Sequence, residues 1–119
     1  MNVAYHGHYL VWFEIGRTEL MREMGCDYGQ LEERDGVYFP LRTVSAHYRV
    51  SARYDDELEI ESRIVKVGGA SVDFEYRVHR LEDRVLIATG ATGHAAITRD
   101  GRLCRLPQWV RDCLSGVNE

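Results

Sequence analysis

The sequence predicts an α+β domain in which one long helix packs against an antiparallel sheet. Near the start of the chain, apolar side chains recur every three or four residues, as they do on one face of a helix. Beyond residue 43 their spacing changes to two, which is typical of half-buried strands, and short turns separate the runs. The 119 residues fit one domain, residues 1–119, with a single core.

The first element is a helix from Tyr9 to Met24. Its apolar face consists of Tyr9, Phe13, Gly16, Leu20 and Met24. Gly25 follows the last of these residues, as a helix C-cap often requires. Gly16 weakens a helix by roughly 1 kcal/mol relative to alanine. We therefore expect another backbone segment to approach the helix closely at Gly16.

Polar residues 26–36 are expected to form a connecting loop, and strands should follow it. Apolar and polar residues alternate over residues 44–50, 58–67 and 72–78, so each run should have one buried and one wet face. Turns are expected at Gly68-Gly69, at Glu82-Asp83 and at Asp100-Gly101. Because short connections join antiparallel neighbours, the runs predict a meander of about four strands.

The fourth run, VLIATGATGHAAIT over residues 85–98, has apolar or small residues on both faces. Such a strand should be covered on both sides, by the helix on one face and by a subunit interface or a ligand on the other. A short terminal helix is expected between Pro107 and Leu114. A sheet with one helix keeps part of its other face uncovered, which favours oligomerisation.

Composition excludes several classes of protein. The formal net charge is −4 and basic residues form no block, which argues against a nucleic-acid-binding protein. The sequence has no apolar run of the ~20 residues that a membrane helix needs, and no signal peptide. Three widely spaced cysteines, an odd number, do not form a disulfide framework, so we expect a reducing, cytoplasmic setting.

The stretch YHGHYLVWFE invites three interpretations. As a metal site, His6 and His8 supply too few ligands, since a catalytic zinc needs three from the protein, and no metal is expected. As a structural element, it is an aromatic-rich helix start. As a catalytic corner, its unpaired helix N-terminal N–H groups can polarise a carbonyl and hold an oxyanion, with Gly7 permitting close approach of a ligand.

The sequence contains VAYHGHYLVWFEIGRTELMREMG near its start, ARYDDELEIESRI in its middle and a later strand that ends in GHAAIT. These three stretches resemble acyl-CoA thioesterases of the hotdog fold, in the 4-hydroxybenzoyl-CoA thioesterase-like superfamily, and look closest to the subfamily associated with the Tol-Pal system. The first stretch is similar to the helix-entry signature of that family. The matched signature positions are Val3, Tyr5, His6, Tyr9, Leu10, Phe13, Glu14 and Arg17.

The resemblance implies a central helix wrapped by a curved antiparallel sheet. It also implies homodimers whose sheets join edge to edge, paired as dimers of dimers into homotetramers, with active sites at the subunit interface. The implied reaction is hydrolysis of an acyl-CoA thioester with the carbonyl polarised by the N–H group at His6. No cofactor is needed, since coenzyme A is part of the substrate. Substrate contacts are expected from Tyr5, Gly7, His8, Tyr9, Phe13 and Tyr54.

Two departures from the family pattern stand out. The catalytic aspartate of the family would fall just before Met1, as would the first strand, so both are absent and activity is expected to be impaired. The asparagine of the signature is His8 here. Glu14 is the leading substitute carboxylate, although it lies about 12 Å along the helix axis from His6. Its other interpretation is a polar helix residue bonded to Arg17 or Thr18.

Several alternatives stay open at this level. The carboxylate would attack the thioester directly or activate water. The chain could instead be a hotdog enoyl-CoA hydratase or dehydratase, or a non-catalytic acyl-CoA-binding or scaffold protein. Asp55 and Asp56 are expected to shape a turn, with Tyr54 at the rim of a ligand site. His94 is expected to be a packed, hydrogen-bonded residue rather than a base.

Overall fold

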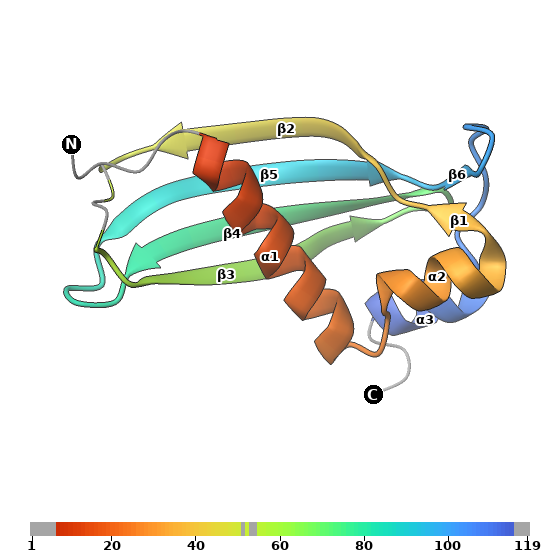
Figure 1. Ribbon diagram of the computed structural model, residues 1–119, viewed down its shortest axis with the longest axis horizontal. Helices are drawn as coiled ribbons and strands as arrows, with labels where there is room; N and C mark the ends of the chain where they lie inside the picture. The colour runs from red at the N-terminus through yellow and green to blue at the C-terminus, as the bar shows by residue number, and fades with distance from the viewer. Residues whose placement is uncertain (1–6, 51, 53–54, 116–119) are drawn as a thin grey trace.

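The computed structural model describes residues 7–50, 52 and 55–115 and confirms the predicted α+β fold (Figure 1). Its helices are α1 (Gly7–Glu23), α2 (Tyr28–Asp35) and α3 (Gln108–Leu114). Its long strands are β2 (Leu41–Tyr48), β3 (Leu58–Val67), β4 (Ser71–Arg80) and β5 (Leu86–Ala95). Two short strands, β1 (Val37–Tyr38) and β6 (Ile97–Thr98), form a separate pair.

The main sheet has the strand order β2-β5-β4-β3, with every pair antiparallel. Strands β3, β4 and β5 form the predicted meander, but the prediction was wrong for β2, which lies beyond β5 at the opposite edge from β3. The connection over residues 49–57 is too long for a tight hairpin, so it can lead the chain from one edge to the other. Among the described strands, β2 therefore has one neighbour and one free edge.

Helix α1 crosses one face of this sheet and packs closely against β3. A Cβ atom at Gly16 would overlap with the side chains of Ile60 and Ser62. The predicted close approach is therefore confirmed, although side chains of β3, rather than another backbone, fill the space. Nearer the start of the helix, Phe13 lies over Gly90 of β5, where a Cβ atom would overlap with its ring. The absence of a side chain at Gly90 thus lets α1 lie close to the sheet.

Residues 28–35 correct the predicted loop, because they form helix α2. The Asp27 side chain accepts a hydrogen bond from the Gly29 N–H at 2.7 Å, as an N-cap does. Gly36 ends the helix with a left-handed φ of 61°. Both capping residues are visible in the sequence, but a polar helix of only eight residues has little apolar periodicity. The predicted terminal helix is confirmed as α3.

Strand β2 is less covered than its alternating pattern predicted. Val44 and Tyr48 lie on the face that carries α1, yet each keeps 45% of its surface exposed. The reason is that α1 packs on β3 and β4 and leaves this side of β2 open. Leu10, Val11 and Ile15 on α1 are also exposed. Strand β2 and helix α1 therefore both carry exposed apolar side chains.

The remaining predictions of turns and helices agree with the structure. Gly68 and Gly69 connect β3 to β4, and Gly101 adopts a φ of 89° in the turn after β6. None of the helices in the described part of the chain has the length and apolar character needed to cross a membrane.

Candidate functional site

The start of α1 supplies backbone donors. Gly7 is the first helical residue, so the N–H groups of the first turn have no partner within the helix. Of the predicted site residues, Tyr5, His6 and Tyr54 lie outside the described residues. His8 and Tyr9 belong to the first turn of α1, and only their backbone is described. The site can therefore be followed from the helix start onward.

Glu14 and Phe13 are adjacent in sequence but face opposite environments. The Phe13 ring is fully buried and stacks on Tyr76 with ring centroids 4.6 Å apart. Glu14 is exposed and lines a hollow of about 720 Å³. Phe13 consequently shapes the core in this chain, and its contact with substrate stays a prediction. Glu14 is the predicted site residue that the structure places at an open cavity.

The hollow lies where α1, α2 and the β1–β6 pair meet. Glu14, Arg17 and Thr18 come from α1, and Glu32 comes from α2. The rest of the lining is Tyr38, Phe39, Pro40, Ile97, Thr98 and Arg99. The lining thus combines two carboxylates and two guanidinium groups with an aromatic wall. In the Arg99–Tyr38 contact, the guanidinium Nε donates to the phenol oxygen at 3.3 Å.

Sequence reasoning missed most of this lining. Residues 38–40 and 97–99 are nearly 60 positions apart, and they meet because β1 pairs with β6. Strands of two residues have no detectable alternation, so the pairing left no periodic signal. The stretch Tyr38-Phe39-Pro40 was the available hint, because three ring-bearing residues at a chain bend are unusual for a simple linker.

Behind the hollow, His94 is buried with 1% of its surface exposed. Its Nδ1 atom lies 3.3 Å from the Phe39 carbonyl oxygen and its Nε2 atom lies 3.0 Å from the Thr92 hydroxyl. Burial, with the nearby positive charge of Arg17, lowers the pKa of His94 to about 4. His94 is therefore neutral at pH 7, and its predicted role as a packed, hydrogen-bonded histidine is confirmed.

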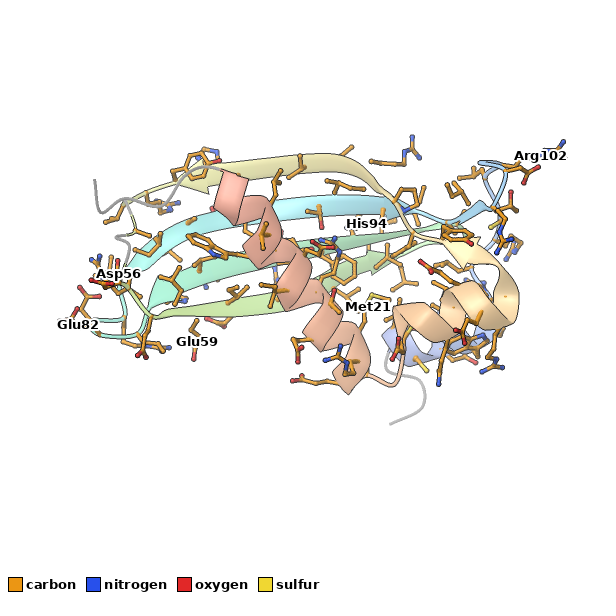
Figure 2. All side chains as sticks on the ribbon, in the orientation of Figure 1. Met21, Asp56, Glu59, Glu82, His94 and Arg102 are labelled. Carbon is orange, nitrogen blue, oxygen red and sulfur yellow. The ribbon has the colours of Figure 1, made fainter. Side chains whose placement is uncertain are left out.

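The Asp55–Asp56 motif lies at the other end of the sheet. Asp56 accepts a hydrogen bond from Arg80 Nη1 at 3.2 Å, and Asp83 accepts one from Arg80 Nε at 3.0 Å. Figure 2 shows Asp56 at the loop end of the sheet, well separated from His94. Asp56 thus ties its loop to the β4–β5 turn, which is a longer-range role than the local turn that we predicted.

Two further groups of the described residues carry metal-binding or nucleophilic side chains. Glu59, Glu61 and His79 bring their ligand atoms within 4.8 Å of one another on the sheet face opposite α1. Arg84 pairs with Glu59 at 3.0 Å, so this cluster already has a compensating cation. The Cys26 thiol is buried, and burial raises its pKa to about 12. Such a thiol is protonated at pH 7 and is not a nucleophile.

A second hollow of about 590 Å³ lies on the sheet face opposite α1. Charged and small residues of the four long strands line it, among them His47, Arg63 and Ala91. The predicted site residues whose side chains the structure describes, Phe13 and Glu14, do not line it. The hollow that contains Glu14 is therefore the better candidate for chemistry.

Comparison with known proteins adds three findings. The family model described as the thioesterase superfamily matches residues 1–87. The chain is 34% identical over 102 residues to the acyl-CoA thioesterase YbgC of Haemophilus influenzae, covering 86% of this chain and 73% of that protein. The chain spans less of two other curated relatives, 56% of the putative acyl-CoA thioesterase YneP of Bacillus subtilis and 63% of the acyl-CoA thioester hydrolase YbgC of Escherichia coli O6:H1.

Solved structures give the same picture. A hypothetical protein of Thermus thermophilus, TT1821, superposes with a TM-score of 0.90 at 30% identity, covering 99% of this chain and 88% of that one. The DHNA-CoA thioesterase of Staphylococcus aureus superposes with a TM-score of 0.89 at 26% identity, covering 98% of this chain and 80% of that one. The hotdog fold predicted from the sequence is confirmed.

Proposed function

The chain belongs to the thioesterase superfamily of hydrolases, and on this premise we propose that it hydrolyses an acyl-CoA thioester to a free acid and coenzyme A. The observation that carries the proposal is the placement of Glu14. Its carboxylate is exposed on the central helix and opens onto a hollow large enough for a small acyl group. Water adds across the thioester bond in this reaction, so no redox cofactor is required.

The start of α1 supports the electrophilic half of the reaction. Its unpaired N–H groups, together with the positive end of the helix dipole, stabilise negative charge that develops on a carbonyl oxygen. We assign this role to the backbone at His6 and Gly7. The contacts predicted for Tyr5, His8, Tyr9, Phe13 and Tyr54 belong to the same proposal.

Glu14 and the helix start of one chain are too far apart to act together, since seven or eight helical residues span about 12 Å. Antiparallel pairing of β2 with a second copy removes this difficulty. Phe39 and Pro40, in the wall of the hollow, come directly before the first residue of β2. In the view of Figure 1, α1 begins over the other end of β2, the end with the arrowhead.

In a two-fold antiparallel pair, the end of one β2 lies beside the beginning of the other. The helix start of one subunit would then approach the Glu14 hollow of its partner. The exposed residues Val44, Tyr48, Leu10, Val11 and Ile15 supply the apolar surface for such a pair. We therefore propose a homodimer with a composite active site, assembled further into a dimer of dimers.

Within this site, Glu14 acts either as a nucleophile or as a general base. Direct attack forms an acyl-enzyme anhydride and releases CoA, and water then hydrolyses the anhydride. General-base catalysis instead removes a proton from the water that attacks the carbonyl. A cytoplasmic location completes the proposal, because acyl-CoA occurs there and the described cysteines are free thiols.

The test is the substitution Glu14→Gln, which keeps the size of the side chain and removes its charge. We expect kcat for CoA release, measured by chromatography over a panel of acyl-CoAs, to fall by about 10²–10⁴-fold. Glu23→Gln is the matched control, because Glu23 is an exposed carboxylate of the same helix outside the hollow. Equal turnover by the Glu14→Gln variant and the wild type would remove Glu14 from the mechanism. A mixed dimer of Glu14→Gln and wild-type subunits should have half the activity whether the site lies within one subunit or is shared between two. The oligomeric state is therefore measured separately by light scattering.

A further inference from the structure

A chain of buried hydrogen bonds runs across the core towards the hollow. Tyr76 on β4 bonds through its hydroxyl group to Thr92 Oγ1 on β5 at 2.5 Å. Thr92 Oγ1 lies 3.0 Å from His94 Nε2, and His94 Nδ1 lies 3.3 Å from the Phe39 carbonyl oxygen. Tyr76, Thr92 and His94 are each at most 3% exposed. These groups are therefore protected from exchange with bulk water.

The acceptor at one end fixes the direction of every hydrogen bond in the chain. A carbonyl oxygen can only accept, so His94 Nδ1 carries the proton and donates to Phe39. Neutral His94 must then accept at Nε2, which makes the Thr92 hydroxyl its donor. Thr92 has one hydroxyl proton, so the Tyr76 hydroxyl donates to Thr92 Oγ1. The protein thus holds His94 in a single tautomer.

The end of this chain is the wall of the Glu14 hollow. Phe39 and Pro40 lie between β1 and β2, outside the regular sheet pairing. The buried Phe39 ring stacks on the His94 ring with centroids 5.3 Å apart. Hydrogen bonding and stacking therefore act together on one residue. If His94 were removed, the Phe39 carbonyl group would lose this hydrogen bond and its ring would lose the stacked partner, so the wall would be held less firmly.

From this arrangement we propose that His94 is a positioning residue for thioester hydrolysis, which fixes the Phe39–Pro40 wall against which the acyl group lies. The inference rests on the proposed function, because it takes the Glu14 hollow as the acyl site. His94 does not touch the substrate, since its ring is enclosed and both nitrogen atoms are engaged. It acts through Phe39, by the hydrogen bond to the carbonyl group and by the stacked rings.

Two substitutions separate positioning from simple packing. In His94→Asn, the side-chain N–H₂ group is as many bonds from Cβ as Nδ1 and can still donate to Phe39. In His94→Gln, the amide reaches the position of Nε2 and keeps the Thr92 contact, but the hydrogen bond from position 94 to the Phe39 carbonyl group is lost. Both variants lose the ring, so both should lose thermal stability to a similar extent.

The measurement is the KM and kcat of each variant with the best acyl-CoA of the panel, together with Tm. We expect KM to rise about tenfold in His94→Gln, the effect of one neutral hydrogen bond, and to stay within about twofold of wild type in His94→Asn. We expect kcat to change little in either variant. Equal KM values for the two variants, whether raised or unchanged, would overturn the proposal.

A second pair covers the case in which neither His94 variant folds. Thr92→Val removes the hydroxyl group that donates to His94 Nε2, so His94 is no longer held in one tautomer. Thr92→Ser keeps this hydroxyl group. KM should rise in Thr92→Val and stay near the wild-type value in Thr92→Ser. Equal KM values for the two Thr92 variants would contradict the proposal. If the wild type hydrolyses no acyl-CoA, the proposed function fails by itself. The dissociation constants of a non-hydrolysable acyl-CoA thioether for the same variants then decide the role of His94 by the same criterion.

Discussion

The two ends of the β4–β5 pair are held together by opposite kinds of chemistry. At the hollow end, Tyr76, Thr92 and His94 form a buried chain of neutral hydrogen bonds. At the other end, Arg80 binds Asp56 and Asp83 in a charged cluster, which we call the clamp. A neutral buried chain depends on its protonation state and shape, whereas the clamp, whose Asp83 side chain is 45% exposed, also depends on ionic strength. The end that lines the candidate site is the one shielded from salt.

The largest difference between the ends should come from packing. Phe13→Ala removes the ring between Gly90 and Tyr76 and opens a cavity in the helix–sheet interface at the hollow end. The free energy of unfolding should fall by about 3–5 kcal/mol. Chemical denaturation measures this change. A loss below about 1 kcal/mol would mean that the helix closes over Gly90 without the ring.

Acid should weaken the hollow end next. The pKa of His94 is about 4 in the folded protein, compared with 6.5 for an ordinary histidine. Burial and the positive charge of Arg17 lower this pKa. The carbonyl groups of Phe39 and Pro40 and the carboxylate of Asp73 act in the opposite direction. Between these pH values the unfolded chain binds more protons, so stability falls as the pH drops from 6.5 towards 4. The loss should reach roughly 3 kcal/mol.

The check on this prediction is denaturation at pH 7, 5.5 and 4.5 for the wild type and for His94→Asn. The variant lacks the titrating ring, so its stability should decline less over this window. Parallel curves for the two proteins would show that other groups cause the acid sensitivity. The clamp should respond to acid at lower pH than His94 does. Arg80 lowers the pKa of Asp83 through its hydrogen bond, so the contribution of ionised Asp83 to stability is lost only at more acidic pH.

The smallest effect is expected at the clamp. Arg80→Ala should reduce Tm by less than the acid effect does, and the reduction should shrink as salt is raised, since salt screens the same charges in the wild type. Arg63→Ala is the matched control, because Arg63 pairs with Glu75 with 76% of its side chain exposed. The control should change stability hardly at all. A salt-independent loss in Arg80→Ala would indicate packing of its stem rather than charge.

Local signals predicted most of the fold. Helix α1, the β3–β4–β5 meander and α3 were found because each buries one face and thus leaves a period in the sequence. The position of β2 was not found, because the partner of a strand depends on residues distant in sequence. Helix α2 was missed although both caps, Asp27 and Gly36, are visible, since a short polar helix leaves almost no period.

The candidate site was predicted in part, for a related reason. Glu14 was identified through its place in a motif, and the structure puts it at the hollow. Its neighbours Phe39 and Arg99 were not identified, because a pairing of two-residue strands brings them there. The contact of Asp56 with Arg80 was not predicted, since Arg80 lies 24 positions away. Contacts that depend on topology cannot be read from spacing.

The free edge of β2 also bears on how a pair of subunits would find its alignment. Backbone hydrogen bonds repeat every two residues, so they alone would accept a copy that has slipped along the strand. The side chains of β2 do not repeat: on the face that carries α1, a medium, a small and a large residue follow one another as Val44, Ala46 and Tyr48. A slipped copy would set unequal sizes against each other. The order of side-chain volumes along β2 would thus select one register for the pairing of two β2 strands.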